Sequence, residues 1–306
     1  MSRYAVRRVL LLIPTWLAVY TLTFGLMQLT PGGPWDREKP VPREVREALD
    51  RKYGLDKPVW QQYVDYLVGV VTRFDFGPSY TSRSRTVNDI IGDFFPVSLS
   101  LGLMAMAVGT LLGVSLGVLS ALRHNSWIDH LAMVFAIGGV SVPAFVVGPL
   151  LVIVFALGLG WVPTQGWGRP EQAILPVLTL ALLPAALLAR YTRAAMLEVT
   201  RMDYIRTARA KGLSERAIVV RHALRNALIP VTTVAGVLLA TVITGSFYVE
   251  LIFNIPGLGR YFVTAVTNRD YPVLMGVTLL FASTIAIVNL LVDLLYGYLD
   301  PRIRYD

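Results

Sequence analysis

The sequence VSLSLGLMAMAVGTLLGVSLGVLSAL, residues 97–122, decides the class of this chain. It contains no charged side chain and lies between Asp93 and Arg123. Crossing about 30 Å of hydrocarbon takes about 20 consecutive apolar residues in a helix, because the backbone must satisfy its own hydrogen bonds there. Residues 97–122 therefore predict a membrane-spanning helix.

Five further windows have a similar composition. They are Val9–Leu29, Leu131–Leu159, Gln172–Ala189, Asn226–Val249 and Tyr271–Val292. The whole chain of 306 residues is 55% hydrophobic and only 16% charged, with a mean hydropathy of +0.57, whereas soluble domains carry about 25% charged residues. We expect an all-α, polytopic membrane protein with about six transmembrane helices, which form a single transmembrane domain over residues 1–306.

Prolines interrupt two of these windows. Pro143 and Pro149 fall in the third window, and Pro176 and Pro184 fall in the fourth. We expect them to break these helices, either as hinges or as fixed kinks. The fourth window is also the shortest of the six, so it is the weakest candidate for a span.

The basic residues predict the orientation. The chain has a net charge of +8. If the N-terminus is inside, the basic excess falls on the inner segments, most of all on 190–225, while the outer segments are balanced. The positive-inside rule then places both termini in the cytoplasm. We interpret the basic character as topological and expect no nucleic-acid partner, because no basic groove is interleaved with aromatic residues. The absence of cysteine excludes thiolate metal sites and disulfides, and we expect no metal site.

A hydrophilic segment at 31–96 follows the first span and is expected outside. It contains two amphipathic helical patterns, Pro42–Leu49 and Val59–Val71. Four apolar side chains of the second pattern share one face: Trp60, Tyr63, Tyr66 and Leu67. The segment is either a small cap on the outer face or a solvated loop on the lipid headgroups.

The internal segment 190–228 contains a short predicted helix. Asp203 is placed to cap Tyr204–Lys211, and Gly212 is a natural left-handed stop. Ser214 then begins a second helix that enters the fifth span. The first helix consists of small and basic residues, and it is too short to bury a core of its own. It is either a docking element for another protein or a basic loop that fixes topology and binds anionic lipid. The candidate residues are Asp203, Tyr204, Arg206, Thr207, Ala208, Arg209, Ala210, Lys211 and Gly212.

The run DYIRTARAKGLS at 203–214 resembles the cytoplasmic coupling loop of ABC importer permeases. It is most similar to the first membrane subunit of the dipeptide, oligopeptide and nickel branch, and RHALRNALIP at 221–230 continues the pattern. The likeness extends over nearly the whole chain, through RRVLLLIP at 7–14, LTPG at 29–32, YGLDKP at 53–58, DFG at 75–77, PGLG at 256–259, LLVDLLY at 290–296 and LDPRIR at 299–304.

Two positions depart from the general ABC importer loop. Arg206-Thr207-Ala208 stands where that loop has Glu-Ala-Ala, and the loop's Leu-Pro would fall at Leu224-Arg225, although the proline here is Pro230. The peptide branch is similar to this chain on both points. The departures therefore argue against the sugar and amino-acid branches.

The resemblance implies a type I ABC importer fold in the bacterial cytoplasmic (inner) membrane. It implies a second homologous permease, two ATPase subunits and an extracytoplasmic solute-binding protein as partners, and di- or oligopeptides as substrate. Nickel complexes, glutathione and oligosaccharides occur in the same branch and stay open. The chain has no Gly-x-x-x-x-Gly-Lys-Ser/Thr loop. We therefore expect no cofactor and no enzyme activity on this chain, with ATP and Mg²⁺ held by the partner ATPases.

The second span carries a stripe of glycines. Gly109, Gly113 and Gly117 predict close helix packing. Gly113–Gly117 also reads as Gly-x-Ser-x-Gly, but a hydrolase would need a strand-to-helix turn and a histidine partner, and all three histidines lie in predicted inner loops.

Asn289 and Asp293 are four residues apart and share a helix face. They are a possible intramembrane polar pair, or Asp293 pairs with an arginine such as Arg7 or Arg302. A self-contained channel or proton-coupled carrier, the alternative class, would need more such groups within the spans.

Overall fold

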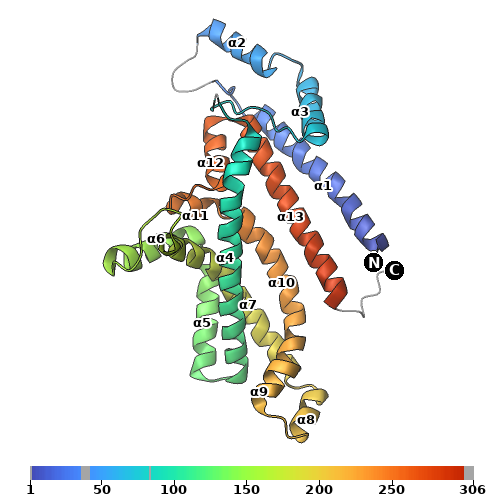
Figure 1. The fold of residues 1–306 in the computed structure, drawn as a ribbon, viewed down its shortest axis with the longest axis vertical. Helices are drawn as coiled ribbons and strands as arrows, with labels where there is room; N and C mark the ends of the chain where they lie inside the picture. Colours follow the sequence, from blue (N-terminus) through green and yellow to red (C-terminus); the bar gives the residue numbers. More distant parts are fainter. Residues whose placement is uncertain (1, 36–41, 83, 300–306) are drawn as a thin grey trace.

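Helices make up most of the described part of the chain, which comprises residues 2–35, 42–82 and 84–299 of the computed structural model. Five long helices run through the molecule (Figure 1): α1 (Ser2–Leu29), α4 (Val87–Leu122), α7 (Pro170–Val199), α10 (Leu224–Thr244) and α13 (Tyr271–Leu299). The shorter helices are α2 (Arg43–Tyr53), α3 (Val59–Arg73), α5 (Trp127–Ser141), α6 (Ala144–Leu151), α8 (Asp203–Ala210), α9 (Glu215–Ala217), α11 (Phe247–Ile252) and α12 (Leu258–Asn268). Two π-helical segments, η1 (Val152–Gly158) and η2 (Ile218–Ala223), continue α6 and precede α10.

The apolar helices match the predicted spans. Five are long and apolar enough to cross a membrane, and the pair Trp127–Ser141 and Ala144–Gly158, bent by 111°, makes a sixth if it is counted as one span. The predicted all-α polytopic fold is therefore confirmed.

The break falls in the third window and not in the fourth. α5 ends at Ser141, Val142 is extended, and Pro143 precedes α6 with φ −62° and ψ 145°. A residue before proline is pushed out of the helical region, and β-branched Val142 is restricted further. The expectation that proline breaks this window is confirmed for Pro143, whereas Pro149 lies inside α6 and does not end it.

The prediction that Pro176 and Pro184 break the fourth window was wrong. α7 is continuous through Pro176 and Pro184, and 61% of its apolar window is buried, compared with 11% for α1. Both prolines are themselves buried. Neighbouring helices support a proline-containing span in this way, because packing compensates for the missing backbone hydrogen bond.

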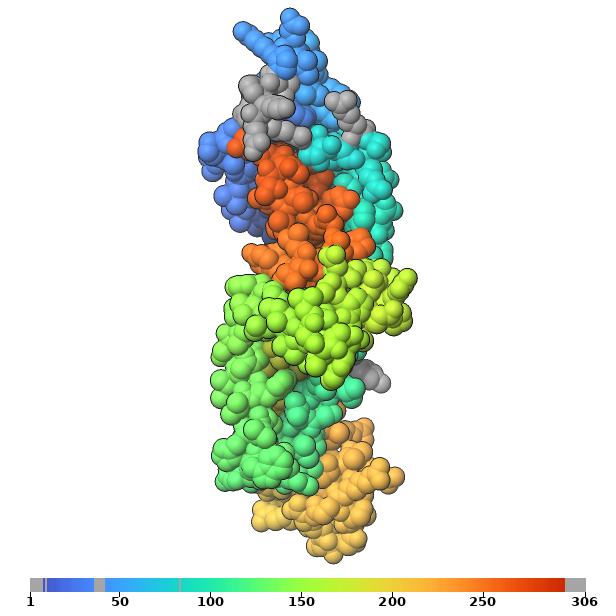
Figure 2. Space-filling view, turned by 90° about the vertical axis from the view of Figure 1, so that its left-hand side faces the viewer, coloured from blue at the N-terminus to red at the C-terminus, as the bar shows by residue number. Residues whose placement is uncertain are grey.

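α7 lies at the centre of the molecule and packs against α4, α5, α6 and α10. Its largest apolar cluster joins α4 and α7 to the α11 region, through residues such as Leu101, Leu180 and Phe253. α13 packs against α10 on one side and α1 on the other (Figure 1). The space-filling view shows an elongated molecule with α5, α6 and η1 on one face (Figure 2).

The segments predicted on opposite sides of the membrane lie at opposite ends. α2 and α3 are at one end, while α8, α9 and the turn between α4 and α5 are at the other (Figure 1). That the end with α8 faces the cytoplasm stays a prediction from the basic residues. The motif at 300–304, including Arg302, lies outside the described residues.

Candidate functional site

The short helix α8 has a buried side and an exposed side. Ile205 and Ala208 are buried in a cluster with Met196 of α7 and Ala121 of α4. The other predicted docking residues on the segment are exposed: Asp203, Tyr204, Arg206, Thr207, Arg209, Ala210, Lys211 and Gly212. α8 is thus anchored to the ends of two long helices while it presents a polar, basic surface.

The N-terminus of α8 differs from the prediction by one residue. The helix begins at Asp203 itself, and the N-cap is Met202, which makes no side-chain capping hydrogen bond. Asp203 lies in the first turn and pairs with Arg206 one turn later. The prediction of Asp203 as the cap was therefore wrong, although its charge still suits the positive end of the helix.

The C-terminal end of α8 follows the prediction. Gly212 has φ +77°, a left-handed conformation that favours glycine, and its N–H donates to Arg209 O at 2.9 Å. Ser214 Oγ then accepts from Ala217 N and caps α9. Arg209 Nε donates to Glu215 Oε1 at 2.8 Å across this turn. The turn therefore holds α8 beside the start of the next span.

A polar contact links α8 to α10. Asn226 Nδ2 donates to Tyr204 Oη at 2.8 Å and to His222 O at 3.1 Å. The start of α8 is thus tied to α10, so that α8 is not a free loop.

The three predicted packing glycines lie against α7. A Cβ on Gly109 would be 2.9 Å from Pro184 Cβ, and one on Gly113 would be 2.6 Å from Ala185 O. A Cβ on Gly117 would be 2.6 Å from Ala189 O. The backbones of α4 and α7 are therefore in direct contact, as small residues allow in membranes. Gly113–Gly117 lies inside continuous α4, so the strand-to-helix turn that a hydrolase nucleophile needs is absent there.

Asp293 lies beside α1. Its carboxylate is 3.1 Å from Arg8 Nη1, and both side chains are partly exposed. Asn289 is exposed one turn earlier on α13. This geometry favours a structural pair between α1 and α13.

Three carboxylates that the sequence analysis did not single out are buried: Asp129, Glu250 and Asp270. Asp129 joins α4, α5 and α7, as described below. Glu250 of α11 is fully buried, and its carboxylate accepts hydrogen bonds from Ser246 Oγ at 2.6 Å and Arg260 N at 3.3 Å. A Cβ on Gly257 or Gly259 would come within 2.8 Å of this carboxylate, which accounts for both glycines of the PGLG motif.

The outer segment packs on the spans through α3. Both predicted helices are present as α2 and α3. Tyr63, Tyr66 and Leu67 pack against Tyr20 of α1, and Tyr20 Oη donates to Tyr63 O at 2.6 Å. Trp60, at the start of the same helix, is 69% exposed and takes no part in this packing.

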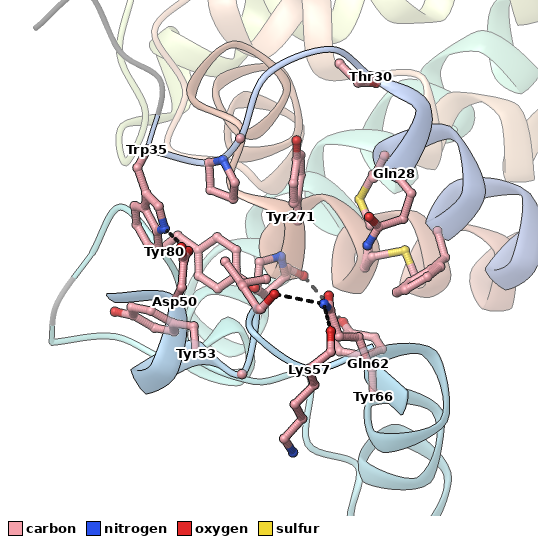
Figure 3. A pocket seen from close by; sticks show the side chains of 18 of the residues that line it. Gln28, Thr30, Trp35, Asp50, Tyr53, Lys57, Gln62, Tyr66, Tyr80 and Tyr271 are labelled. Atoms are coloured by element: carbon pink, nitrogen blue, oxygen red, sulfur yellow. Dashed lines mark hydrogen bonds between the residues drawn. The ribbon is translucent and has the colours of Figure 1, made fainter. Parts of the chain in front are cut away.

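A cavity of about 430 Å³ lies between α1, α2, α3 and the start of α13 (Figure 3). Aromatic rings form part of its wall: Trp35, Tyr53, Tyr66, Tyr80 and Tyr271. Trp35 Nε1 donates to Asp50 at 2.8 Å, which ties the exit of α1 to α2. Among the described residues, no group of three His, Cys, Asp or Glu side chains could hold a metal ion.

The fold has counterparts among solved ABC transporters. A chain of the inward-facing MetNI methionine ABC transporter matches with a TM-score of 0.60 at 17% identity, over 69% of this chain and 96% of that chain. A crystal structure of an amino acid ABC transporter with histidines matches with a TM-score of 0.51 at 18% identity, over 71% and 95%. The chain therefore has the transmembrane fold of type I ABC importers.

Two family models cover almost all of the sequence. "Binding-protein-dependent transport system inner membrane component" matches residues 113–305, and the N-terminal model of such membrane components matches residues 1–102. The chain belongs to this family and is a multi-pass permease of the bacterial inner membrane.

Full-length relatives place it within the family. The dipeptide transport system permease protein DppB of Bacillus subtilis is 47% identical over 99% of this chain and 98% of its own length. The oligopeptide transport system permease proteins OppB of Haemophilus influenzae and Escherichia coli K12 are 42% and 43% identical over the full length of both chains. The resemblance to the first membrane subunit of the peptide branch is confirmed.

Proposed function

We propose that this chain is one of two membrane subunits of an ATP-driven importer, and that α8 receives the motion of the ATPase subunits. A second homologous permease, two ATPase subunits and an extracytoplasmic binding protein complete the complex. ATP and Mg²⁺ bind to the ATPases. The observation that carries this proposal is the two-sided α8, because Ile205 and Ala208 anchor it to α4 and α7 while its basic side is exposed.

The substrate class follows from the relatives. Proteins 41–47% identical over nearly their full length are named dipeptide or oligopeptide permeases. We therefore assign di- or oligopeptides to this chain. Nickel complexes, glutathione and oligosaccharides are the alternatives, and competition for uptake of a radiolabelled dipeptide distinguishes them.

A bulky group at Gly212 tests the docking surface. A Cβ there would meet nothing within 4 Å, so the fold has room for a side chain. Its φ of +77° strains most residues but is tolerated best by asparagine. Gly212→Asn therefore controls for backbone strain, and Gly212→Trp adds bulk at the proposed interface.

The measurement is co-purification with the ATPase subunits, together with uptake of a radiolabelled dipeptide. We expect Gly212→Trp to lose the ATPases while the chain stays inserted, and Gly212→Asn to keep them. Normal assembly and uptake in Gly212→Trp would contradict the proposal.

A further inference from the structure

A single buried carboxylate joins the ends of α4, α5 and α7 near α8. Asp129 is 2% exposed. Its oxygens accept hydrogen bonds from Ser120 Oγ at the end of α4, and from Asn125 N at 2.9 Å in the following turn. Arg193 of α7 donates twice, from Nε to Oδ1 at 2.6 Å and from Nη2 to Oδ2 at 2.8 Å. This charge-assisted, bidentate geometry is specific in orientation as well as favourable in energy.

α5 packs on α7 mainly through small residues. Apart from Asp129, its buried residues are small: Ala132, Ala136 and Gly139. Its large side chains, such as Leu131, Val134 and Ile137, are exposed. Gly139 lies close to α7, where an added Cβ would be 2.8 Å from Ala186 Cβ. The bidentate pair adds a directional polar contact at the start of α5. Arg193 and Asp129 therefore tie the start of α5 to α7.

The pair lies close to α8. Met196 is one turn beyond Arg193 on α7 and packs in the same cluster as Ile205 and Ala208 of α8. Displacement of α8 therefore moves this end of α7 directly. α5 in turn leads to the 111° bend before α6, and Gly148 of α6 contacts Phe253 beyond α11.

We propose that Arg193 and Asp129 are a positioning pair of the transport cycle, which passes displacement of α8 from α7 to α5 and the bent span. Neither residue touches the substrate in this proposal. It rests on the proposed function, because it supposes that α8 is driven by ATPase subunits. Without the pair, α7 moves and α5 lags behind, so that ATP is hydrolysed with less transport.

The variants must avoid leaving one buried charge alone, since an unpaired charge unfolds proteins for unrelated reasons. Arg193→Lys keeps the charge but loses the bidentate fork. The double variant Asp129→Asn with Arg193→Gln removes both charges and keeps a polar side chain at each position. Arg190→Lys is the matched control, because Arg190 is an exposed arginine on the same helix, one turn earlier.

The experiment uses the complete complex in proteoliposomes and measures radiolabelled dipeptide uptake and ATP hydrolysis on the same sample. We expect Arg193→Lys and the double variant to assemble and to hydrolyse ATP within about twofold of the wild type, with dipeptide imported per ATP reduced about fivefold. Arg190→Lys should match the wild type.

An unchanged ratio of uptake to hydrolysis in both variants would overturn the inference. So would an equal fall of both activities with loss of assembly in both variants, because the pair would then be structural only. If the wild-type complex itself shows no ATP-driven uptake, the proposed function fails. If the wild-type complex couples ATP hydrolysis to uptake and both pair variants do so equally well, only the positioning role is refuted.

Discussion

Gly113 of α4 lies directly against Ala185 of α7. A Cβ on Gly113 would be 2.6 Å from the carbonyl oxygen of Ala185 and 2.8 Å from Leu188 Cβ. Because both nearest atoms belong to the body of a buried helix, neither can move aside cheaply. The two central spans therefore depend on the missing side chain.

Gly113→Ala should lower the stability of the permease by about 1–3 kcal/mol, as overpacking of a tight core does. Thermal unfolding in detergent measures this. Gly138→Ala on α5 is the control, since a Cβ there meets nothing within 4 Å. A loss of equal size in both variants would show that the close approach of α4 and α7 is not the cause.

Asp270 anchors the turn before α4, and its replacement should release that turn. The carboxylate is 1% exposed and accepts from Ser79 Oγ at 2.6 Å, Thr81 Oγ1 at 2.7 Å, and the N–H groups of Tyr80 and Thr81 at 3.1 Å. An asparagine has one acceptor oxygen, so that donors are left unpaired at a cost of about 1–3 kcal/mol.

We expect Asp270→Asn to speed tryptic cleavage near Arg85 in the folded protein. Asp56→Asn, an exposed carboxylate of the same outer segment, should leave cleavage unchanged. Identical digestion of Asp270→Asn and the wild type would refute the anchoring role.

Asp293→Asn should have little effect. Both side chains of its ion pair with Arg8 are partly exposed, and such pairs contribute about 0–1 kcal/mol to stability. We therefore expect dipeptide uptake within about twofold of the wild type, measured in cells with matched expression. Abolished uptake with normal assembly would favour a carrier in which Asp293 takes part in ion movement.

The aromatic residues that line the cavity between α1, α2 and α3, among them Tyr66 and Tyr80, should stabilise the fold less at high pH. Burial, and next the Asp270 carboxylate, raise the pKa of Tyr80 above its ordinary value, and burial likewise raises the pKa of Tyr66. A raised folded pKa means that the neutral phenol stabilises the fold below the unfolded value of about 10. This stabilisation is lost as the pH rises from there toward the folded pKa.

Unfolding of the permease in detergent, followed at increasing pH, measures this effect. The wild type should lose stability above about pH 10, and Tyr80→Phe should lose less, because it has one phenol fewer to ionise. Trp35 lies 5.4 Å from the Tyr80 ring and serves as the fluorescent reporter. Superimposable pH curves for the two proteins would contradict the assignment.

The sequence predicts the spans well because charge-free length is a local property. It predicts the short elements of the inner segment for the same reason, since Gly212 and Ser214 act on their immediate neighbours. It wrongly predicts a break in the fourth window, because the effect of a proline depends on what packs around it. Pro184 lies against Gly109 inside α7's buried surface, whereas Pro143 follows Val142 at a bend.

The polar contacts between distant segments could not be predicted. Asp129 lies in the first turn of α5, yet its main partner is Arg193 of another helix. Glu250 reads as a loop charge, although it is buried under Gly257 and Gly259. The two glycines of PGLG were the available signal, because neighbouring glycines indicate a close approach of something to the backbone.

The contacts that α8 makes in the cell provide the most direct test of its proposed role. The chain has no native cysteine, so a single introduced cysteine is the only thiol on this chain that can be labelled or cross-linked. Thr207→Cys lies on the exposed side of α8, and Lys52→Cys lies on α2 at the opposite end. We predict that Thr207→Cys cross-links to the ATPase subunit and is not labelled by a membrane-impermeant maleimide in intact cells, whereas Lys52→Cys is labelled and forms no ATPase adduct. Labelling of Thr207→Cys from outside, with no ATPase adduct, would contradict the claim that α8 receives the motion of the ATPases.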